Sequence, residues 1–381
     1  MPEKPLPTAA VLLPCLLKGG TEVASLETAV AMQSLGLEVE VIVYFDEIDA
    51  GMRESFEALG VRVIALGLRR DQSVLQLALR LVRALGRRDL VWLQYMTPTL
   101  VPLLVARALS RRLVAAVHVG ASHLGKGARR RLHWLSRRVC ERVVCVSETS
   151  ASGLFGAPGA NTRARVCVIP NAVDTAAARA ARAEDWRARA GWPQDALVVG
   201  YLGRLAPIKG PDLLVSAFAQ LAAERPALRL VLAGAGAEDG ALRAQASRLG
   251  ISNRVHFAGP LPRTQVFSAL RGFDLAVVPS REEGFGLSAA EALAAGVATV
   301  ATHVGALPEV LAQGRIGILV APESPAALAQ GMAALLDDPV QRAMLATAGA
   351  ADIARHYGRD ALRRALAALC DELGVIVEAG R

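Results

Sequence analysis

Two carboxylates, Glu283 and Glu291, lie on either side of a Gly-Phe-Gly turn in the stretch REEGFGLSAAEALAAG (281–296). The apolar run DLAVVPS before it predicts a buried strand, and the Ala-rich run after it predicts a helix that begins close to Gly286. Gly284 and Gly286 let the backbone turn tightly and approach a ligand closely. The free amides in the first turn of the helix would then form a site for an anion such as a diphosphate.

A second loop, GRLAPIKG (203–210), supplies the positive charge that a diphosphate needs. Arg204 and Lys209 in this loop can make the charge-assisted hydrogen bonds that phosphates require. Phosphates would repel the two glutamates, so we expect each glutamate to accept hydrogen bonds from hydroxyl groups. Glu291 would then contact a ribose, and Glu283 a sugar at the other end of the ligand. These residues together predict a site for a nucleotide diphosphate sugar.

The same stretch also allows a purely structural interpretation. Ser288-x-x-Glu291 is a capping-box pattern, in which the glutamate would only accept a hydrogen bond from the amide of Ser288. Glu282 and Glu283 would then be exposed acids favoured by the positive end of the helix. The stretch by itself leaves both interpretations open.

The elements that must position these loops alternate along the whole chain. Seven β-branched runs precede NAVDT (171–175), six follow it, and amphipathic or Ala/Leu-rich helical runs separate them. Such alternation is typical of parallel sheets covered on both faces. We therefore predict an α/β protein of two facing Rossmann-like, doubly wound parallel-sheet domains with a ligand-binding cleft between them. The predicted domains span residues 1–173 and 174–356, and residues 357–381 form a final helix.

The composition narrows the class of protein. The chain has 381 residues, of which 53% are hydrophobic and 4% aromatic, and no apolar run reaches the ~18–20 residues that would cross a bilayer. The opening run KPLPTAAVLLPCLLKGG lacks a clean small-residue cleavage site, so we interpret it as a first strand and turn, and not as a signal peptide. Five scattered cysteines without a CxxC motif indicate reduced thiols, with no zinc site and a cytoplasmic location.

The net charge of +8 belongs entirely to the first half of the chain. Much of it lies in KGARRRLHWLSRRVCER (126–142), where Leu132, Leu135 and Val139 share one helical face and arginines surround it. One interpretation is an ordinary helix with a solvated basic face. The other is peripheral docking onto anionic lipid at the inner face of the membrane, with Trp134 at the interface. Nucleic acid is not expected as a partner, because the chain has few aromatic residues and no known binding motif.

Seven motifs, which follow one another along the chain in the family's order, resemble the retaining glycosyltransferases of family 4, which have the GT-B fold. Glu283-Gly-Phe285-Gly286…Glu291 matches the family's E-x-F-G-x4-E pattern. The other matching segments are KGGTE (18–22), AAVH ending at His118, VCVSETS (144–150), VIPNAVD (168–174), GRLAPIKG (203–210), and GALPEVL with GILVAP (305–311 and 317–322).

The resemblance implies transfer of a sugar from a nucleotide diphosphate sugar to an acceptor hydroxyl, with retention and without a metal or other cofactor. Arg204, Lys209 and the amides around Gly284, Phe285, Gly286 and Leu287 would hold the donor diphosphate. Glu291 would bind its ribose and Glu283 its sugar. Gly19, Gly20 and His118 would approach the donor from the amino-terminal, acceptor-binding domain. The final helix would cross back to that domain.

Several points remain open from sequence alone. His123, five residues beyond His118, competes for any role given to that histidine. The base of the donor (uridine or guanosine), the sugar, the linkage and the acceptor, for which a lipid-linked molecule is one candidate, are undecided. One rival function is a sugar-nucleotide 2-epimerase of the same architecture, and another is a non-catalytic sugar-nucleotide sensor. A third is a nicotinamide-dependent oxidoreductase, prompted by GAGAEDG (234–240), whose glycine spacing is GxGxxxG.

Overall fold

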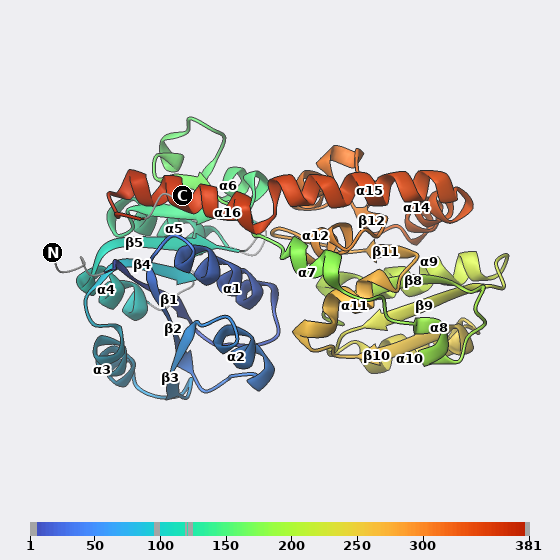
Figure 1. Cartoon of the computed structure of the whole chain (residues 1–381), viewed down its shortest axis with the longest axis horizontal. Coiled ribbons are helices and arrows are strands. Elements are labelled where there is room, and N and C mark those ends of the chain that lie inside the picture. The colour runs from blue at the N-terminus through green and yellow to red at the C-terminus, as the bar shows by residue number, and fades with distance from the viewer. Residues whose placement is uncertain (1–5, 95–99, 119, 121–124, 378–381) are drawn as a thin grey trace. The chain divides into compact units, whose positions relative to one another are not determined.

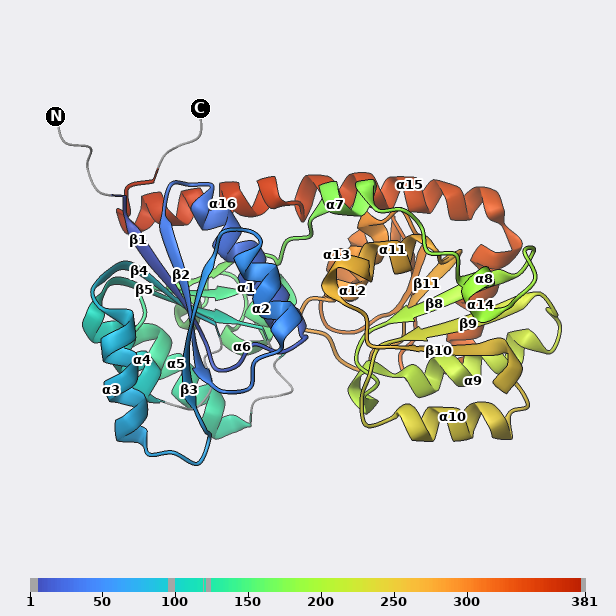
Figure 2. The same cartoon turned by 60° about the horizontal axis from the view of Figure 1, so that its bottom comes forward.

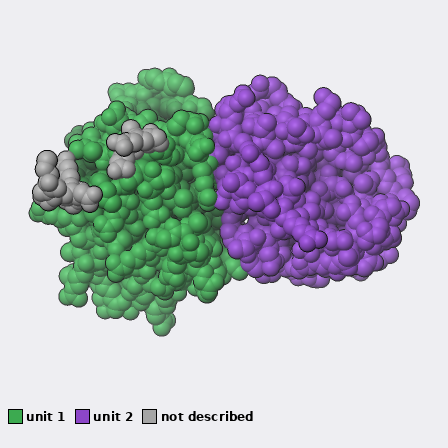
Figure 3. Space-filling model, in the orientation of Figure 1, with its two compact units in different colours: residues 1–172, 359–381 green, residues 173–358 purple. Residues whose placement is uncertain are grey.

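The structure is a computed structural model that describes residues 6–94, 100–118, 120 and 125–377. The chain divides into two compact units (Figure 3). Unit 1 contains residues 1–172 and 359–381, and unit 2 contains residues 173–358. These divisions lie beside the boundaries expected at 173 and 357, and the final segment belongs to unit 1.

Unit 1 is built on a parallel sheet of seven strands in the order β3-β2-β1-β4-β5-β6-β7 (Figure 1). The strands are β1 (Thr8–Leu13), β2 (Glu38–Phe45), β3 (Arg62–Leu68), β4 (Arg88–Gln94), β5 (Ser110–Val117), β6 (Arg142–Cys145) and β7 (Val166–Val168). All seven coincide with β-branched runs expected to be strands. Those runs are apolar almost throughout because helices bury both faces of a parallel sheet.

Helices cover the two faces of this sheet. They are α1 (Gly20–Gln33), α2 (Ala50–Glu57), α3 (Val74–Leu85), α4 (Leu100–Leu109), α5 (Lys126–Arg138), α6 (Glu148–Phe155) and α16 (Arg359–Leu373). α1 and α2 lie on one face, whereas α3, α4 and α5 lie on the other (Figures 1 and 2). Buried residues of α3, α4, α5 and α6 form one hydrophobic cluster with the strands. α16 packs against α1, where the Arg359 guanidinium forms an ion pair with the buried Glu27.

Unit 2 has a parallel sheet of six strands in the order β10-β9-β8-β11-β12-β13. The strands are β8 (Leu197–Leu202), β9 (Leu228–Ala233), β10 (Val255–Gly259), β11 (Leu275–Val278), β12 (Thr299–Thr302) and β13 (Ile318–Val320). These also coincide with the expected runs. The chain therefore contains two doubly wound α/β units, as the sequence predicts.

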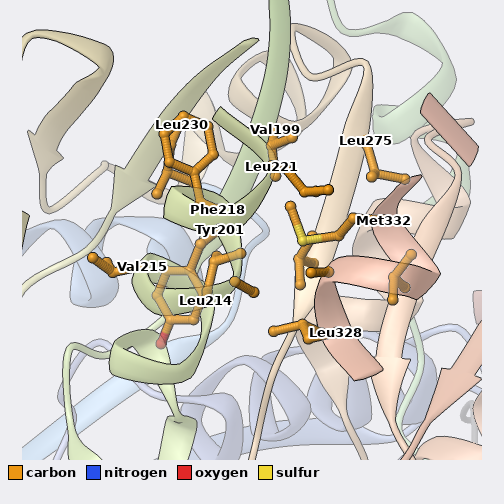
Figure 4. Packing of buried hydrophobic residues seen from close by; sticks show 14 of the residues in the cluster. Val199, Tyr201, Leu214, Val215, Phe218, Leu221, Leu230, Leu275, Leu328 and Met332 are labelled. Carbon is orange, nitrogen blue, oxygen red and sulfur yellow. The ribbon is translucent and has the colours of Figure 1, made fainter. Parts of the chain in front are cut away.

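The helices of unit 2 are α7 (Thr175–Ala180), α8 (Trp186–Ala190), α9 (Pro211–Ala222), α10 (Asp239–Arg248), α11 (Val266–Arg271), α12 (Leu287–Ala294), α13 (Leu307–Val310), α14 (Pro325–Asp337) and α15 (Pro339–His356). α9 and α14 pack on one face of the sheet, where Phe218, Leu328 and Met332 meet strand residues such as Val199 and Leu230 (Figure 4). This core fixes the position of the loops that leave the carboxyl ends of the strands.

Each sheet has one switch point, where successive strands are added in opposite directions. In unit 1 it lies between β1 and β4, and in unit 2 between β8 and β11. Loops that leave the carboxyl ends of two strands at a switch point diverge, and ligands of open α/β sheets bind there. The loops that follow β8 and β11 are the two that carry the predicted donor-site residues.

Candidate active site

The loops that follow β8 and β11 are held together at several points. The amide of Arg281 donates a hydrogen bond to the carbonyl oxygen of Ile208, with a distance of 2.9 Å. Gly210 has a φ of +63°, and a Cβ atom at this position would lie 2.1 Å from the carbonyl oxygen of Pro279. Only glycine fits here, because it tolerates both the left-handed backbone and the close approach.

The Arg281 side chain strengthens this connection. Its guanidinium makes two hydrogen bonds, of 2.8 and 2.7 Å, to the carboxylate of Asp212 in α9. Burial acts to raise the pKa of Asp212, but the hydrogen bond and charge of Arg281 outweigh it and hold that pKa below its usual value. The pair stays ionised and fixes the start of α9 beside the turn.

Lys209 and Glu283, one from each loop, form an ion pair. The Lys209 Nζ atom lies 2.6 Å from the Glu283 Oε1 atom, and the Ser280 hydroxyl donates a hydrogen bond of 2.9 Å to the same oxygen. Glu283 and Ser280 are buried, and Lys209 is only partly exposed. The alternative in which Glu283 is an exposed acid is therefore wrong.

The backbone at Glu283 is supported by the loop that follows β12. The amide of Ala306 donates a hydrogen bond of 3.3 Å to the carbonyl oxygen of Glu283. Gly305 has a φ of +53°, and a Cβ atom there would lie 1.8 Å from that oxygen. The GALPEVL segment singled out in the sequence thus packs directly under the turn that carries Glu283.

α12 begins at the Gly-Phe-Gly turn, as predicted. Its N-cap is Gly286, which has a φ of +95° and supplies no side chain to cap the helix. The amides of Ala289 and Ala290 donate hydrogen bonds to the carbonyl oxygen of Gly286. Leu287 and Ser288 occupy the first turn, where α-helical amides have no intrahelical acceptor. This end of α12 can therefore receive an anion.

The Glu291 carboxylate forms an ion pair with the Arg263 guanidinium, which reaches it from the short helix at Arg263–Gln265. Glu291 is 4% exposed, so its carboxylate is largely shielded from bulk solvent. Because the N-cap is Gly286, Ser288 is not at a capping position. The capping-box interpretation is therefore wrong.

Arg204 is exposed and follows β8 directly. Its guanidinium makes no hydrogen bond or ion pair with the residues that the structure describes, so its charge is available to an anionic ligand. The hydroxyl of the buried Tyr201 donates a hydrogen bond of 2.6 Å to the carbonyl oxygen of Arg204. Burial, aided by the charge of Glu283, raises the pKa of Tyr201, so this donor keeps its proton.

Phe285, the central residue of the turn, is buried and packs edge-on against Tyr357, with ring centroids 5.5 Å apart. The glycines of GAGAEDG also have packing roles. A Cβ atom at Gly234 would lie 1.8 Å from the carbonyl oxygen of Gly203, and one at Gly236 would lie 2.1 Å from that of Leu205. These two glycines let the loop after β9 pack against the loop after β8, which accounts for them without a nicotinamide cofactor.

In unit 1, Gly19 is the N-cap of α1 and Gly20 is its first residue. The Glu22 carboxylate folds back over this end of the helix: a Cβ atom at Gly19 would lie 2.4 Å from the Glu22 Oε2 atom. The backbone at Gly19 is extended, with a φ of −143°, which any residue can adopt, and the Glu22 side chain is flexible enough to move aside for a Cβ atom. Both glycines follow β1, at the switch point of the unit 1 sheet.

His118 directly follows β5, beside that switch point. Its Nε2 atom is hydrogen-bonded to the Oε1 atom of Gln94, the buried last residue of β4. Burial lowers the pKa of His118 to about 4, so the ring is neutral near neutral pH. His123, the alternative to His118, lies outside the described residues.

Arg263 and Gln94 are partners of predicted residues that were not expected from sequence. Each lies at or just beyond the carboxyl end of a strand, which is the only local signal that it carries. The predicted residues themselves fall into two groups. Arg204, Lys209, Glu283 to Leu287 and Glu291 gather at the switch point of unit 2, whereas Gly19, Gly20 and His118 belong to unit 1.

Family profiles match both units of the chain. Residues 18–177 match the profile described as Glycosyltransferase Family 4, and residues 182–352 match the one described as Glycosyl transferases group 1. The chain belongs to the family 4 glycosyltransferases. The resemblance inferred from the seven motifs is thus confirmed.

Known members of the family include D-inositol 3-phosphate glycosyltransferases. The one from Streptomyces avermitilis is 44% identical over 150 residues, which are 37% of this chain and 32% of that protein. The one from Acidothermus cellulolyticus is 37% identical over 195 residues, which are 49% of this chain and 43% of that protein. The aligned region thus spans less than half of the length of these relatives.

Solved structures share the fold of this family 4 chain. HepE of Anabaena, in complex with UDP and glucose, has a TM-score of 0.81 at 23% identity, over 96% of this chain and 99% of that one. Sucrose-phosphate synthase from Thermosynechococcus elongatus has a TM-score of 0.77 at 20% identity, over 97% of this chain and 99% of that one. The GT-B class predicted from sequence is confirmed.

α5 (Lys126–Arg138) forms most of the basic segment 126–142. Leu132, Leu135 and Val139 are buried, as expected, and Trp134 is exposed. Arg130, Arg131, Arg137 and Arg138 are exposed as well. Across the residues that the structure describes, every helix is too short or too polar to cross a bilayer.

Proposed function

We propose that this chain is a glycosyltransferase that transfers a sugar from a nucleotide diphosphate sugar to an acceptor hydroxyl, with retention. The observation that supports the proposal most strongly is the ion pair between Lys209 and Glu283 at the switch point of unit 2, beside the open end of α12. Lys209 is a cation that can bind phosphate, and Glu283 is an acceptor for hydroxyl groups, and the two lie next to each other. That arrangement suits a ligand whose phosphate is bonded directly to a sugar.

The cationic groups would stabilise the leaving nucleotide. As the bond between the anomeric carbon and the phosphate oxygen breaks, negative charge grows on the diphosphate. Arg204, Lys209 and the amides of Leu287 and Ser288 would bind that charge more strongly as it develops, which lowers the barrier. The site is prepared for this before the ligand arrives, because Lys209 is already held by Glu283.

The carboxylates would orient the donor. Glu283 would accept hydrogen bonds from hydroxyls of the transferred sugar, and Glu291, held by Arg263, from the ribose. Neutral His118 could accept a hydrogen bond from the sugar or the acceptor, a role that its lowered pKa permits. Retention is proposed from the family. No metal is required, because the chain's own cations match the diphosphate charge.

The proposal is tested by calorimetric titration of UDP, GDP and their sugars, with EDTA present. UDP comes first, because HepE is described in complex with UDP. We expect one nucleotide to bind to the wild type. Its affinity for Lys209→Met should be about 10- to 100-fold lower, because a charged hydrogen bond is lost. Arg225→Met is the matched control, because Arg225 is equally buried and pairs with Asp337 elsewhere in unit 2. If no nucleotide binds, or if Lys209→Met binds as the wild type does, the proposed donor site is wrong.

A sugar-nucleotide 2-epimerase would bind the same donor, so a second experiment separates the two activities. The donor is incubated with the enzyme in the absence and presence of candidate acceptor alcohols, and its sugar is identified. A transferase leaves that sugar unchanged at C2 when no acceptor is present. Conversion at C2 without an acceptor would instead favour the epimerase. A sensor would bind the donor and release no nucleoside diphosphate in either case.

We further propose a cytoplasmic location at the inner face of the membrane, with a lipid-linked acceptor. Support comes from the five free cysteines, which suit a reducing compartment, and from the exposed basic residues and Trp134 of α5. Anionic headgroups would attract this helix and concentrate the enzyme where a lipid-linked substrate lies.

A further inference from the structure

The two faces of the unit 1 sheet carry helices of opposite charge. α3, α4 and α5 on one face contain nine Lys or Arg residues, two in α3, one in α4 and six in α5, and no Asp or Glu. α1 and α2, which lie on the other face (Figure 2), have sequences that contain four glutamates and one arginine. The excess positive charge in the first half of the sequence is therefore concentrated over one face of the sheet.

α3 has two apolar faces, of which the protein buries only one. Leu77, Leu81 and Leu85 recur at intervals of four and are all buried against the sheet. Leu75, Leu79 and Val82 form a second stripe at i, i+4 and i+7, on a different side of the helix. These three side chains are 68%, 50% and 45% exposed. A soluble helix is normally polar on the side away from its core, so this stripe lacks its usual polar character.

α4, which packs beside α3, also has exposed apolar side chains. Leu100 and Leu104 are 44% and 54% exposed, at a spacing of four residues on one side of α4. On α5, Trp134 is 57% exposed and lies among the basic residues. We call the exposed side chains of α3, α4 and α5 the α3–α5 face. It combines aliphatic stripes, one tryptophan and cations, without acidic residues.

We infer that the α3–α5 face docks onto an anionic lipid bilayer, with the stripes of α3 and α4 inserted among the headgroups. This inference builds on the proposed lipid-linked acceptor and extends the contact from α5 to two further helices. Basic residues attract the anionic surface at a distance, and aliphatic side chains add a contribution that salt does not screen. A surface of uniformly negative headgroups is the complement of three helices that carry no acid at all.

The surface also provides the geometry for such docking. Leu75 and Leu79 leave α3 on the side opposite its buried leucines, so they can enter a bilayer while the core remains intact. Arg83 is exposed on the same helix, where its long side chain can reach phosphates while its apolar stem lies along the lipid boundary. An interfacial helix of this kind needs no change of fold to bind.

The test is co-sedimentation of the full chain with vesicles of phosphatidylcholine alone or with about 30% phosphatidylglycerol. Leu75→Gln/Leu79→Gln removes the α3 stripe, and Arg130→Gln/Arg131→Gln removes part of the charge. Val340→Gln/Met344→Gln on α15 is the matched apolar control, because these residues are 69% and 68% exposed at the same spacing. Arg363→Gln/Arg364→Gln on α16 is the matched charge control.

We expect binding to the anionic vesicles only, and a decrease of about tenfold or more for each α3–α5 variant, with both controls unchanged. In salt of about 0.5 M the binding of the wild type and of the arginine variant should fall to a similar low level, because salt screens the attraction of the basic residues to the anionic headgroups. Absence of wild-type binding, or binding by Leu75→Gln/Leu79→Gln equal to the wild type, would overturn the inference. The inference would also be overturned if the wild type forms an oligomer and does not bind vesicles, and Leu75→Gln/Leu79→Gln abolishes that oligomer.

Nucleotide titration of the same variants keeps this result separate from the proposed function. Leu75→Gln/Leu79→Gln changes surface residues of unit 1, whereas Lys209 and Glu283 lie in unit 2. Its nucleotide affinity should therefore equal that of the wild type. If the wild type binds vesicles but no nucleotide, only the proposed donor site is contradicted. If it binds a nucleotide but no vesicles, only the proposed docking surface is contradicted.

Discussion

The Lys209 Nζ atom lies 2.6 Å from the Glu283 Oε1 atom, so the residue expected to bind phosphate and the residue expected to bind sugar hydroxyls are direct partners. A lysine for phosphate and a glutamate for sugar hydroxyls thus position each other. Each restricts the movement of the other in a site that is largely buried. Variants of either residue will therefore show effects on both tasks unless the measurement separates them.

Glu283→Gln is expected to separate them. The amide has the same shape and can still accept a hydrogen bond, but it has no charge to strengthen contacts with the sugar in the transition state. We expect kcat to fall about 10²-fold or more, while the affinity for the nucleoside diphosphate alone changes less than about threefold. Steady-state kinetics and calorimetry provide the two values. An equal loss of nucleoside diphosphate affinity would mean that Glu283 only positions Lys209.

Glu291→Ala is expected to remove recognition of the ribose. The wild type should bind a nucleoside diphosphate more tightly than its 2′-deoxy and 3′-deoxy analogues, by about 1–3 kcal/mol at the hydroxyl that Glu291 contacts. Glu291→Ala should bind all three alike, and Arg263→Met should show a smaller loss, because Arg263 acts through Glu291. Calorimetry with the analogues measures both effects. If the variant only unfolds at a lower temperature and still discriminates, Glu291 is a structural residue.

Gly210→Ala is expected to be strongly destabilising. The alanine would have to keep a φ of +63°, which strains a residue with a side chain. Its Cβ atom would also lie 2.1 Å from the Pro279 carbonyl oxygen, so the loops after β8 and β11 must separate. Gly250→Ala isolates the backbone effect, because Gly250 has a φ of +70° and nothing within 4 Å of the added atom. We expect a loss of about 1 kcal/mol for Gly250→Ala and about 3 kcal/mol or more for Gly210→Ala in urea unfolding. Equal losses would show that the two loops move apart freely.

The neutral state of His118 gives a dependence of stability on pH. Burial lowers its pKa from 6.5 to about 4 in the folded chain, so the unfolded chain binds the proton more tightly. The contribution of neutral His118 to the free energy of unfolding is complete above about pH 6.5. It decreases as the pH falls towards 4 and does not change further below that pH. The size of this contribution to the free energy of unfolding is about 3 kcal/mol.

His118→Gln should remove that part of the pH dependence while leaving stability at pH 7 within about 1 kcal/mol, because an amide can also bond to Gln94. Urea unfolding of both proteins between pH 4 and pH 7 measures the difference, and NMR titration of the ring measures the pKa directly. A ring that titrates near pH 6.5 would contradict the buried environment described for His118.

The sequence alone determined the strands, the two-unit α/β class and the loops with Arg204, Lys209 and Glu283. These features depend on local patterns: β-branched apolar runs form strands, and glycines next to charged residues at strand ends form binding loops. The tertiary structure decided the partners. Arg263, 28 positions before Glu291 in the sequence, reaches its carboxylate, and no local pattern identifies that partner. It also decided which apolar stripe of α3 is covered, because helical periodicity identifies both stripes equally and only packing buries one of them.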